Sequence, residues 1–206
     1  TTKPPQMLLT HPLPESRISE ARIRAQQYPL RHVPDNLDFQ LAKARIQVRF
    51  SGYSEAAVLS MFEKQLKHHR YTFKSAAEYG KALAFFRMDK FEESEKIIDE
   101  LLANEPNNLF FIDTKTDLLT QKGDYKTAIA LLLNQQKIKP TSSVVNTNLA
   151  NVYIENDQTE KAIPLLEDLI FLDKQDQLAY FLLTEAYKKN GNKAMEHFVK
   201  AESLAL

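Results

Sequence analysis

The feature of this sequence that most constrains its fold is a residue pattern that recurs every 34 positions. Pro106 and Pro140 are 34 residues apart, and Lys174 occupies the next equivalent position. Three kinds of residue recur at fixed distances before these points. The turn residues are Asp89, Gly123 and Asp157, the small residues are Ser94, Ala128 and Ala162, and the large apolar residues are Ile98, Leu132 and Leu166. A fixed period of this length predicts stacked structural repeats.

The period and residue types resemble tetratricopeptide (TPR) repeats, in which antiparallel helix hairpins stack into an all-α superhelical solenoid. Small residues are expected where neighbouring helices approach closely, at Ala82, Thr116, Ala150 and Thr184, and apolar residues fill the next turn, at Phe85, Leu119, Tyr153 and Tyr187. The predicted hairpins are 75–88 with 91–104, 109–122 with 125–138, 143–156 with 159–172, and 177–190 with 192–204. In the fourth hairpin, Ala194 and Phe198 match the pattern only after a two-residue deletion.

The sequence predicts three regions, 1–34, 35–72 and 73–206. The first holds an irregular Pro-rich segment and a helix that starts near Pro14 and stops before Pro29. The second is expected to be an atypical leading hairpin of helices 35–50 and 54–69. The inward residues of these two helices are predicted to be Leu37, Leu41, Ala44, Ile46 and Val48, and Val58, Leu59, Phe62 and Leu66.

Charge and hydrophobicity exclude several classes of function. The 27 basic residues are balanced by 27 acidic residues, so no basic excess is available to neutralise nucleic-acid phosphates. No apolar stretch approaches the length needed to span a bilayer. Cysteine is absent, which is compatible with either the cytosol or the periplasm. The sequence opens with Thr rather than Met, and we expect an internal cut or a mature end.

The concave face of such a solenoid is lined by the first helix of each hairpin. Its mixture of aromatic, amide and acidic residues favours binding of an extended peptide, although the aromatic rings would also suit packing against an adjacent domain or the N-terminal helices. Some TPR domains use Lys and Arg to clamp a C-terminal carboxylate, and that set is absent. The predicted binding residues are Tyr79, Leu83, Phe86, Phe110, Asp113, Asp117, Val144, Thr147, Asn151 and Phe181, beside Arg87, Gln121, Glu155, Glu185 and Lys188.

No motif in this chain supports catalysis by itself. None of the five histidines belongs to an HExxH motif, in which two imidazoles would hold zinc and a glutamate would activate water. His68 and His69 are adjacent and therefore point to different helix faces. There is no phosphate-binding loop, GxSxG motif or cysteine nucleophile. We therefore expect this chain to be no enzyme and to hold no metal or other cofactor.

One N-terminal segment carries a second resemblance. Residues 10–18, THPLPESRI, are similar to the motif that follows the last zinc ligand in the Ste-twenty-four/HtpX-like HExxH metalloproteases. The order of this segment, the sequence LDFQLAKARIQVRF and four TPR-like hairpins resembles the BepA/YfgC-like periplasmic group of these proteases along nearly the whole chain. The HExxH helix and the later Glu ligand are missing. The resemblance therefore implies the C-terminal TPR half of a zinc metalloprotease.

This resemblance implies roles for residues that the periodicity leaves unexplained. His11 and Arg17 would approach the zinc site of the intact parent, where either could stabilise an oxyanion and His11 could alternatively occupy the open position of the zinc. The implied location is the periplasm. The implied partners are outer-membrane β-barrel proteins, their assembly machinery and the parent's peptidase domain. The alternatives are a freestanding TPR adaptor or scaffold and a self-associating repeat protein.

Overall fold

The computed structural model describes residues 14–28 and 34–205. It divides the chain into two compact units, residues 1–35 and residues 36–206. The Pro-rich residues before Pro14, including His11, lie outside the described residues.

The first unit contains one described helix, α1, at Pro14–Gln26. Proline suits the first turn of a helix because its missing N–H would have no partner there. The helix ends before Pro29, as the sequence predicts. Ile18, Ile23 and Arg17 are all exposed on it.

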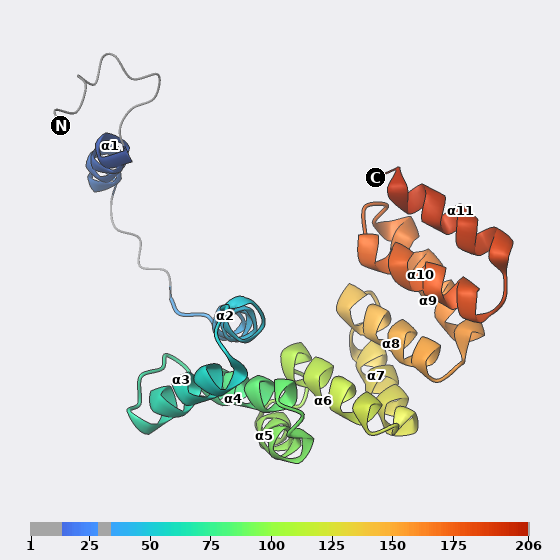
Figure 1. Cartoon of the computed structure of the whole chain (residues 1–206), viewed down its shortest axis with the longest axis horizontal. Helices are drawn as coiled ribbons and strands as arrows, with labels where there is room; N and C mark the ends of the chain where they lie inside the picture. Colours follow the sequence, from blue (N-terminus) through green and yellow to red (C-terminus); the bar gives the residue numbers. More distant parts are fainter. Residues whose placement is uncertain (1–13, 29–33, 206) are drawn as a thin grey trace. The chain divides into compact units, whose positions relative to one another are not determined.

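The second unit is all-helical, with no strand within residues 34–205 (Figure 1). The four predicted repeat hairpins are confirmed, and their helix boundaries agree with the predicted ones to within one residue. After the leading helices α2 and α3, the hairpins are α4 with α5, α6 with α7, α8 with α9, and α10 with α11. The bounds are α2 Leu37–Phe50, α3 Glu55–Lys67, α4 Lys74–Arg87, α5 Phe91–Asn104, α6 Leu109–Gln121, α7 Tyr125–Ile138, α8 Ser143–Glu155, α9 Thr159–Leu172, α10 Gln177–Lys189 and α11 Lys193–Leu204.

The turn inside each hairpin shows the 34-residue period at the level of the backbone. Asp89, Gly123, Asp157 and Gly191 all adopt a positive φ, between 54° and 74°. A left-handed residue ends the first helix and lets the chain reverse within a few residues. Glycine does so without strain, and aspartate tolerates this conformation better than most residues.

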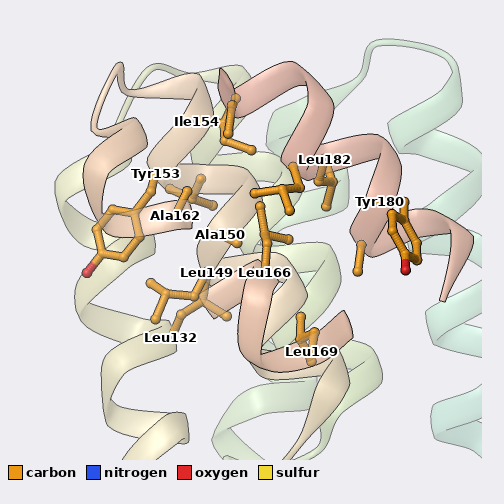
Figure 2. Close-up of a cluster of buried hydrophobic side chains, with 14 of the residues drawn as sticks. Leu132, Leu149, Ala150, Tyr153, Ile154, Ala162, Leu166, Leu169, Tyr180 and Leu182 are labelled. Atoms are coloured by element: carbon orange, nitrogen blue, oxygen red, sulfur yellow. The ribbon is translucent and has the colours of Figure 1, made fainter. Parts of the chain in front are cut away.

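Small residues let the two helices approach closely in the first three repeat hairpins. Ser94, Ala128 and Ala162 are fully buried, as are the large residues that follow them at Ile98, Leu132 and Leu166. The Ser94 hydroxyl donates a hydrogen bond to the carbonyl oxygen of Ala82 at 2.8 Å, which joins α5 to α4. Figure 2 shows the apolar side chains of α7 to α10 gathered between the helices. Burial at the same position in successive repeats confirms the predicted solenoid packing.

The last hairpin corrects one sequence prediction. Gly191 and the start of α11 keep the 34-residue period, so no deletion is present. Ala194 is exposed and Phe198 is 58% exposed, whereas Val199 is buried. In α11 a different helix face therefore packs against α10. The prediction that Ala194 and Phe198 occupy the buried repeat positions was wrong.

The leading helices pack differently from the predicted hairpin. α2 and α3 each lie against α4 and make little contact with one another. The α3–α4 contact is close at Gly80, where a β-carbon would lie 2.2 Å from the Phe62 ring. Leu41, Ala44 and Val48 of α2 are buried as predicted, but Ile46 is 59% exposed. α2 therefore acts as an extra helix laid on α4.

Candidate protein-binding groove

The first helices of successive hairpins share a surface on which most of the predicted binding residues lie. α4, α6 and α8 together line a hollow of about 360 Å³. At one end of this surface, the side chains of α2 cover α4 and the start of α6. The surface therefore has a filled part and an open part.

The filled part centres on the side chain of Tyr79 in α4. Tyr79 is 0% exposed, and its hydroxyl accepts hydrogen bonds from Arg45 Nε at 2.9 Å and from Thr114 Oγ1 at 3.4 Å. Burial raises the pKa of the Tyr79 hydroxyl. The Tyr79 ring lies edge-on to Phe110, with 6.0 Å between the ring centroids. Tyr79 is therefore a core residue that joins α2, α4 and α6.

Arg45 is the side chain by which α2 fills this end of the groove. Its guanidinium lies 2.6 Å from Oδ2 of Asp113 and 5.1 Å from the centre of the Phe110 ring. Oδ1 of Asp113 accepts a further hydrogen bond from Asn148 Nδ2 at 2.7 Å. The arginine thus combines an ion pair with a cation–π contact in a partly buried place, where both interactions are stronger than in water.

These contacts correct the expected exposure of four predicted binding residues. Tyr79 and Leu83 are buried, and Phe86 and Phe110 are half-buried. Phe110 packs beneath Arg45, and Phe86 packs edge-on against Phe91 of α5 at 5.5 Å between ring centroids. For Tyr79 and Phe110, the structure shows the alternative in which aromatic rings pack against the chain's own N-terminal helices.

The open part begins one helical turn after Asp113. Asp117 lines the hollow from α6, and Asn148, Asn151 and Glu155 line it from α8. Burial, and next the neighbouring Asp113 carboxylate, raise the pKa of Asp117 to about 6, while Arg49 and Arg45 act in the opposite direction. Asp117 and Asn151 therefore lie where the sequence predicts, on an accessible polar surface.

The remaining predicted residues lie further along the first helices. Val144 is exposed and Thr147 is half-buried on α8, and Phe181 on α10 is 59% exposed. Phe181 lines a second hollow of about 510 Å³ with Glu185 and Lys188. The structure thus leaves Asp117, Asn151, Val144 and Phe181 accessible and places Tyr79 and Leu83 in the core.

Sequence reasoning missed Arg45 and Asn148, which form the polar link between α2, α6 and α8. A signal for Arg45 was available, since it precedes Tyr79 by 34 residues and Asp113 follows Tyr79 by 34. Extending the period backwards into the leading helix would therefore have placed Arg45 on the groove. Asn148 gives no comparable signal, because its role depends on the rotation of α8 about its axis.

Within the described residues, no group of three or more His, Asp or Glu side chains is arranged to hold a metal ion. The same part of the chain has no helix that is long and apolar enough to cross a membrane.

The fold of the second unit is that of a tetratricopeptide repeat solenoid. The family profile described as tetratricopeptide repeat matches residues 119–187. A tetratricopeptide repeat protein from Parabacteroides merdae superposes with a TM-score of 0.66 over 93% of this chain and 71% of that chain, at 15% identity. MamA from Desulfovibrio magneticus RS-1 superposes with a TM-score of 0.60 over 85% of this chain and 97% of that chain, at 16% identity. Similarities at this identity show the fold alone.

Along its whole length, the chain is homologous to part of the β-barrel assembly-enhancing proteases (BepA), as the N-terminal segment and repeat order indicate. A putative β-barrel assembly-enhancing protease from Vibrio cholerae is 36% identical over 205 residues, which are 100% of this chain and 42% of that protein. The β-barrel assembly-enhancing proteases of Yersinia pestis and Escherichia coli K12 are 35% and 34% identical, with the same coverage. The chain spans less than half the length of these curated relatives.

Proposed function

We propose that this chain is the protein-binding TPR region of a periplasmic zinc metalloprotease. In this proposal it captures client or partner proteins during the assembly and quality control of outer-membrane proteins. The names of the homologues support a link to β-barrel assembly and to a protease, and the TPR fold supports protein binding. The zinc and the HExxH motif would belong to a peptidase domain beyond this sequence, which the similarity of the THPLPESRI segment supports.

The observation that carries the proposal is the division of the groove. α2 covers the end at Tyr79, whereas the surface from Asp117 to Phe181 combines an accessible aromatic ring with amide and acidic groups. Rings supply contact area to an extended chain, and amides such as Asn151 can bond its peptide groups. An open, mixed surface of this kind suits an unfolded polypeptide better than a small molecule.

The roles of His11 and Arg17 remain part of this proposal. His11 lies outside the described residues, and Arg17 is exposed on α1. Both would act only in the intact parent, near its zinc. A freestanding adaptor is the second candidate, and the sequence encoded before residue 1 separates the two. An HExxH motif followed by a later Glu ligand supports the protease, and their absence supports the adaptor.

Client binding can be tested with a fluorescently labelled, urea-unfolded outer-membrane β-barrel protein diluted into solutions of the chain. We expect Asn151→Ala and Phe181→Ala together to weaken binding by about tenfold, since exposed rings and polar anchors carry much of the affinity of such surfaces. Ile138→Ala, at an exposed apolar position on α7, is the control and should bind as the original chain does. Equal binding by all three proteins would refute the groove assignment.

A further inference from the structure

The open hollow has a chemical preference that protein binding in general does not specify. Its lining includes two carboxylates, Asp117 and Glu155, and the amides of Gln121, Asn148 and Asn151. Among the described residues, no lysine, arginine or histidine lines it. The hollow therefore combines two carboxylates and several amides with the apolar side chains of Phe86 and Val152, and its net negative charge favours a positively charged guest.

No cationic side chain within residues 34–205 pairs directly with the Asp117 carboxylate. In that part of the chain it makes no hydrogen bond and no ion pair within 4.0 Å, although the residue is half-buried. Charged groups on two helices act on its pKa: Asp113 of α6 raises it, and Arg49 and Arg45 of α2 lower it, while Glu155 of α8 lines the same hollow. A partly buried charge without a partner is costly, so a cation arriving at this place would remove that cost.

The groove already binds a cationic side chain one helical turn away. Arg45 is seated on Asp113 at 2.6 Å, with its guanidinium over the Phe110 ring. Asp117 follows Asp113 by four residues and so lies on the same face of α6. The first of these two acidic positions is filled from within the chain by α2, and the second opens onto the hollow.

We propose that the hollow binds the arginine or lysine side chain of an extended client segment, seated on Asp117 with Glu155 opposite. The Asn151 and Gln121 amides would bond the main chain on either side of that residue. This inference rests on the proposed function and adds the chemistry of the client at this point. Carboxylates bind guanidinium and ammonium groups with short, charge-assisted hydrogen bonds, so the position selects for basic residues in the client.

The probe is a pair of short, unstructured Gly/Ser peptides with blocked ends. One carries a central arginine and the other a central citrulline, which has nearly the same shape and no charge. Two-dimensional ¹H–¹⁵N NMR titration of the whole 206-residue chain detects weak binding and locates it. We expect the arginine peptide to shift the amide signals of Asp117, Asn151 and Glu155, and the citrulline peptide to leave them in place.

Two isosteric substitutions complete the test. Asp117→Asn should weaken binding of the arginine peptide by at least about tenfold, because it removes the opposing charge. Asp168→Asn makes the same change at an exposed carboxylate of α9 outside the hollow and should leave the affinity unchanged. Thermal melting will show that both variants fold. Equal affinity for the two peptides, undetectable binding, or an unaffected Asp117→Asn variant would overturn the proposal.

The pH dependence of the affinity for the arginine peptide is a second test of the proposal. Because the pKa of Asp117 is about 6 in the free protein, its carboxylate is protonated progressively below that pH. The affinity for the arginine peptide should therefore fall between about pH 7 and pH 5, and the Asp117→Asn variant should show a smaller change. Binding of an unfolded β-barrel client separates this proposal from the proposed function. If the Asn151→Ala and Phe181→Ala changes weaken that binding but Asp117→Asn does not, the proposed function stands and only the cation site is refuted.

Discussion

At the scale of single residues, the Gln135 side chain departs from the repeat pattern. It is 1% exposed on α7, at the position that Leu101 and Leu169 occupy in the neighbouring repeats. Its Nε2 donates to Asn107 Oδ1 at 3.1 Å, but its Oε1 is buried without a hydrogen-bond partner in the described part of the chain. A buried acceptor left unpaired in this way lowers the stability of the fold.

We therefore expect Gln135→Leu to raise the free energy of unfolding by about 1 kcal/mol. Removing the unpaired buried oxygen should stabilise the fold by about 1–3 kcal/mol, and losing the hydrogen bond to Asn107 should offset about 1 kcal/mol of that gain. Gln136→Leu is the control. Gln136 donates to Asn146 Oδ1 at 2.8 Å and is only half-buried, so its replacement should give no gain. Urea denaturation measures both variants. A lower midpoint for Gln135→Leu would show that its amide is satisfied.

Asp117 makes the stability of the fold depend on pH. Its pKa is raised from 3.8 in the unfolded chain to about 6 in the folded chain, so the folded state binds the proton more tightly. Stability from this group is therefore greatest at low pH and is lost as pH rises from about 4 to about 6. By the usual conversion the loss is at most roughly 3 kcal/mol.

Asp117→Asn should remove this dependence. The variant and the original chain should unfold at similar urea concentrations near pH 4, and the variant should be more stable by about 1–3 kcal/mol near pH 7. Asp168→Asn again serves as the exposed control. A stability difference that does not change with pH would mean that the carboxylate is well solvated in the folded protein.

At the scale of helices, the closest approach is between α3 and α4 at Gly80. A β-carbon there would lie 2.2 Å from the fully buried ring of Phe62. Gly80→Ala should lower the free energy of unfolding. Overpacking costs about 1–3 kcal/mol, whereas the better helix propensity of alanine stabilises the helix by only about 1 kcal/mol. In a Phe62→Ala background the ring is gone, and the same change should become stabilising. Thermal or urea melting of the four proteins measures this reversal of sign, and its absence would contradict the close contact.

The helices also show which features could be predicted from the sequence alone. The 34-residue period predicted every hairpin boundary to within one residue, because turn, small and apolar positions are set locally in each repeat. It predicted Asp117 and Asn151 on the groove for the same reason. The groove prediction failed for Tyr79, and the apolar stripe predicted for the leading helix failed for Ile46, since the burial of both residues depends on where α2 lies. That placement rests on contacts such as Arg45 with Asp113, between residues far apart in the sequence.

At the scale of the whole molecule, catalysis is expected to require residues beyond this chain. The chain carries no HExxH motif, and its described residues include no cluster suited to a metal. After dialysis against a chelator, we expect no stoichiometric zinc by elemental analysis and no cleavage of unfolded casein. Retention of about one zinc per chain, or casein cleavage that a chelator abolishes, would contradict this account.

In the proposed function, an unfolded client lies along the open groove between Asp117 and Phe181. Site-specific photocrosslinking tests it most directly, with p-benzoylphenylalanine replacing Asn151 in the groove or, as a control, exposed Lys137 on α7. After illumination with an unfolded outer-membrane β-barrel protein, we expect a strong crosslink from position 151 and little or none from position 137. Equal crosslinking from both positions, or crosslinking from position 137 alone, would contradict it.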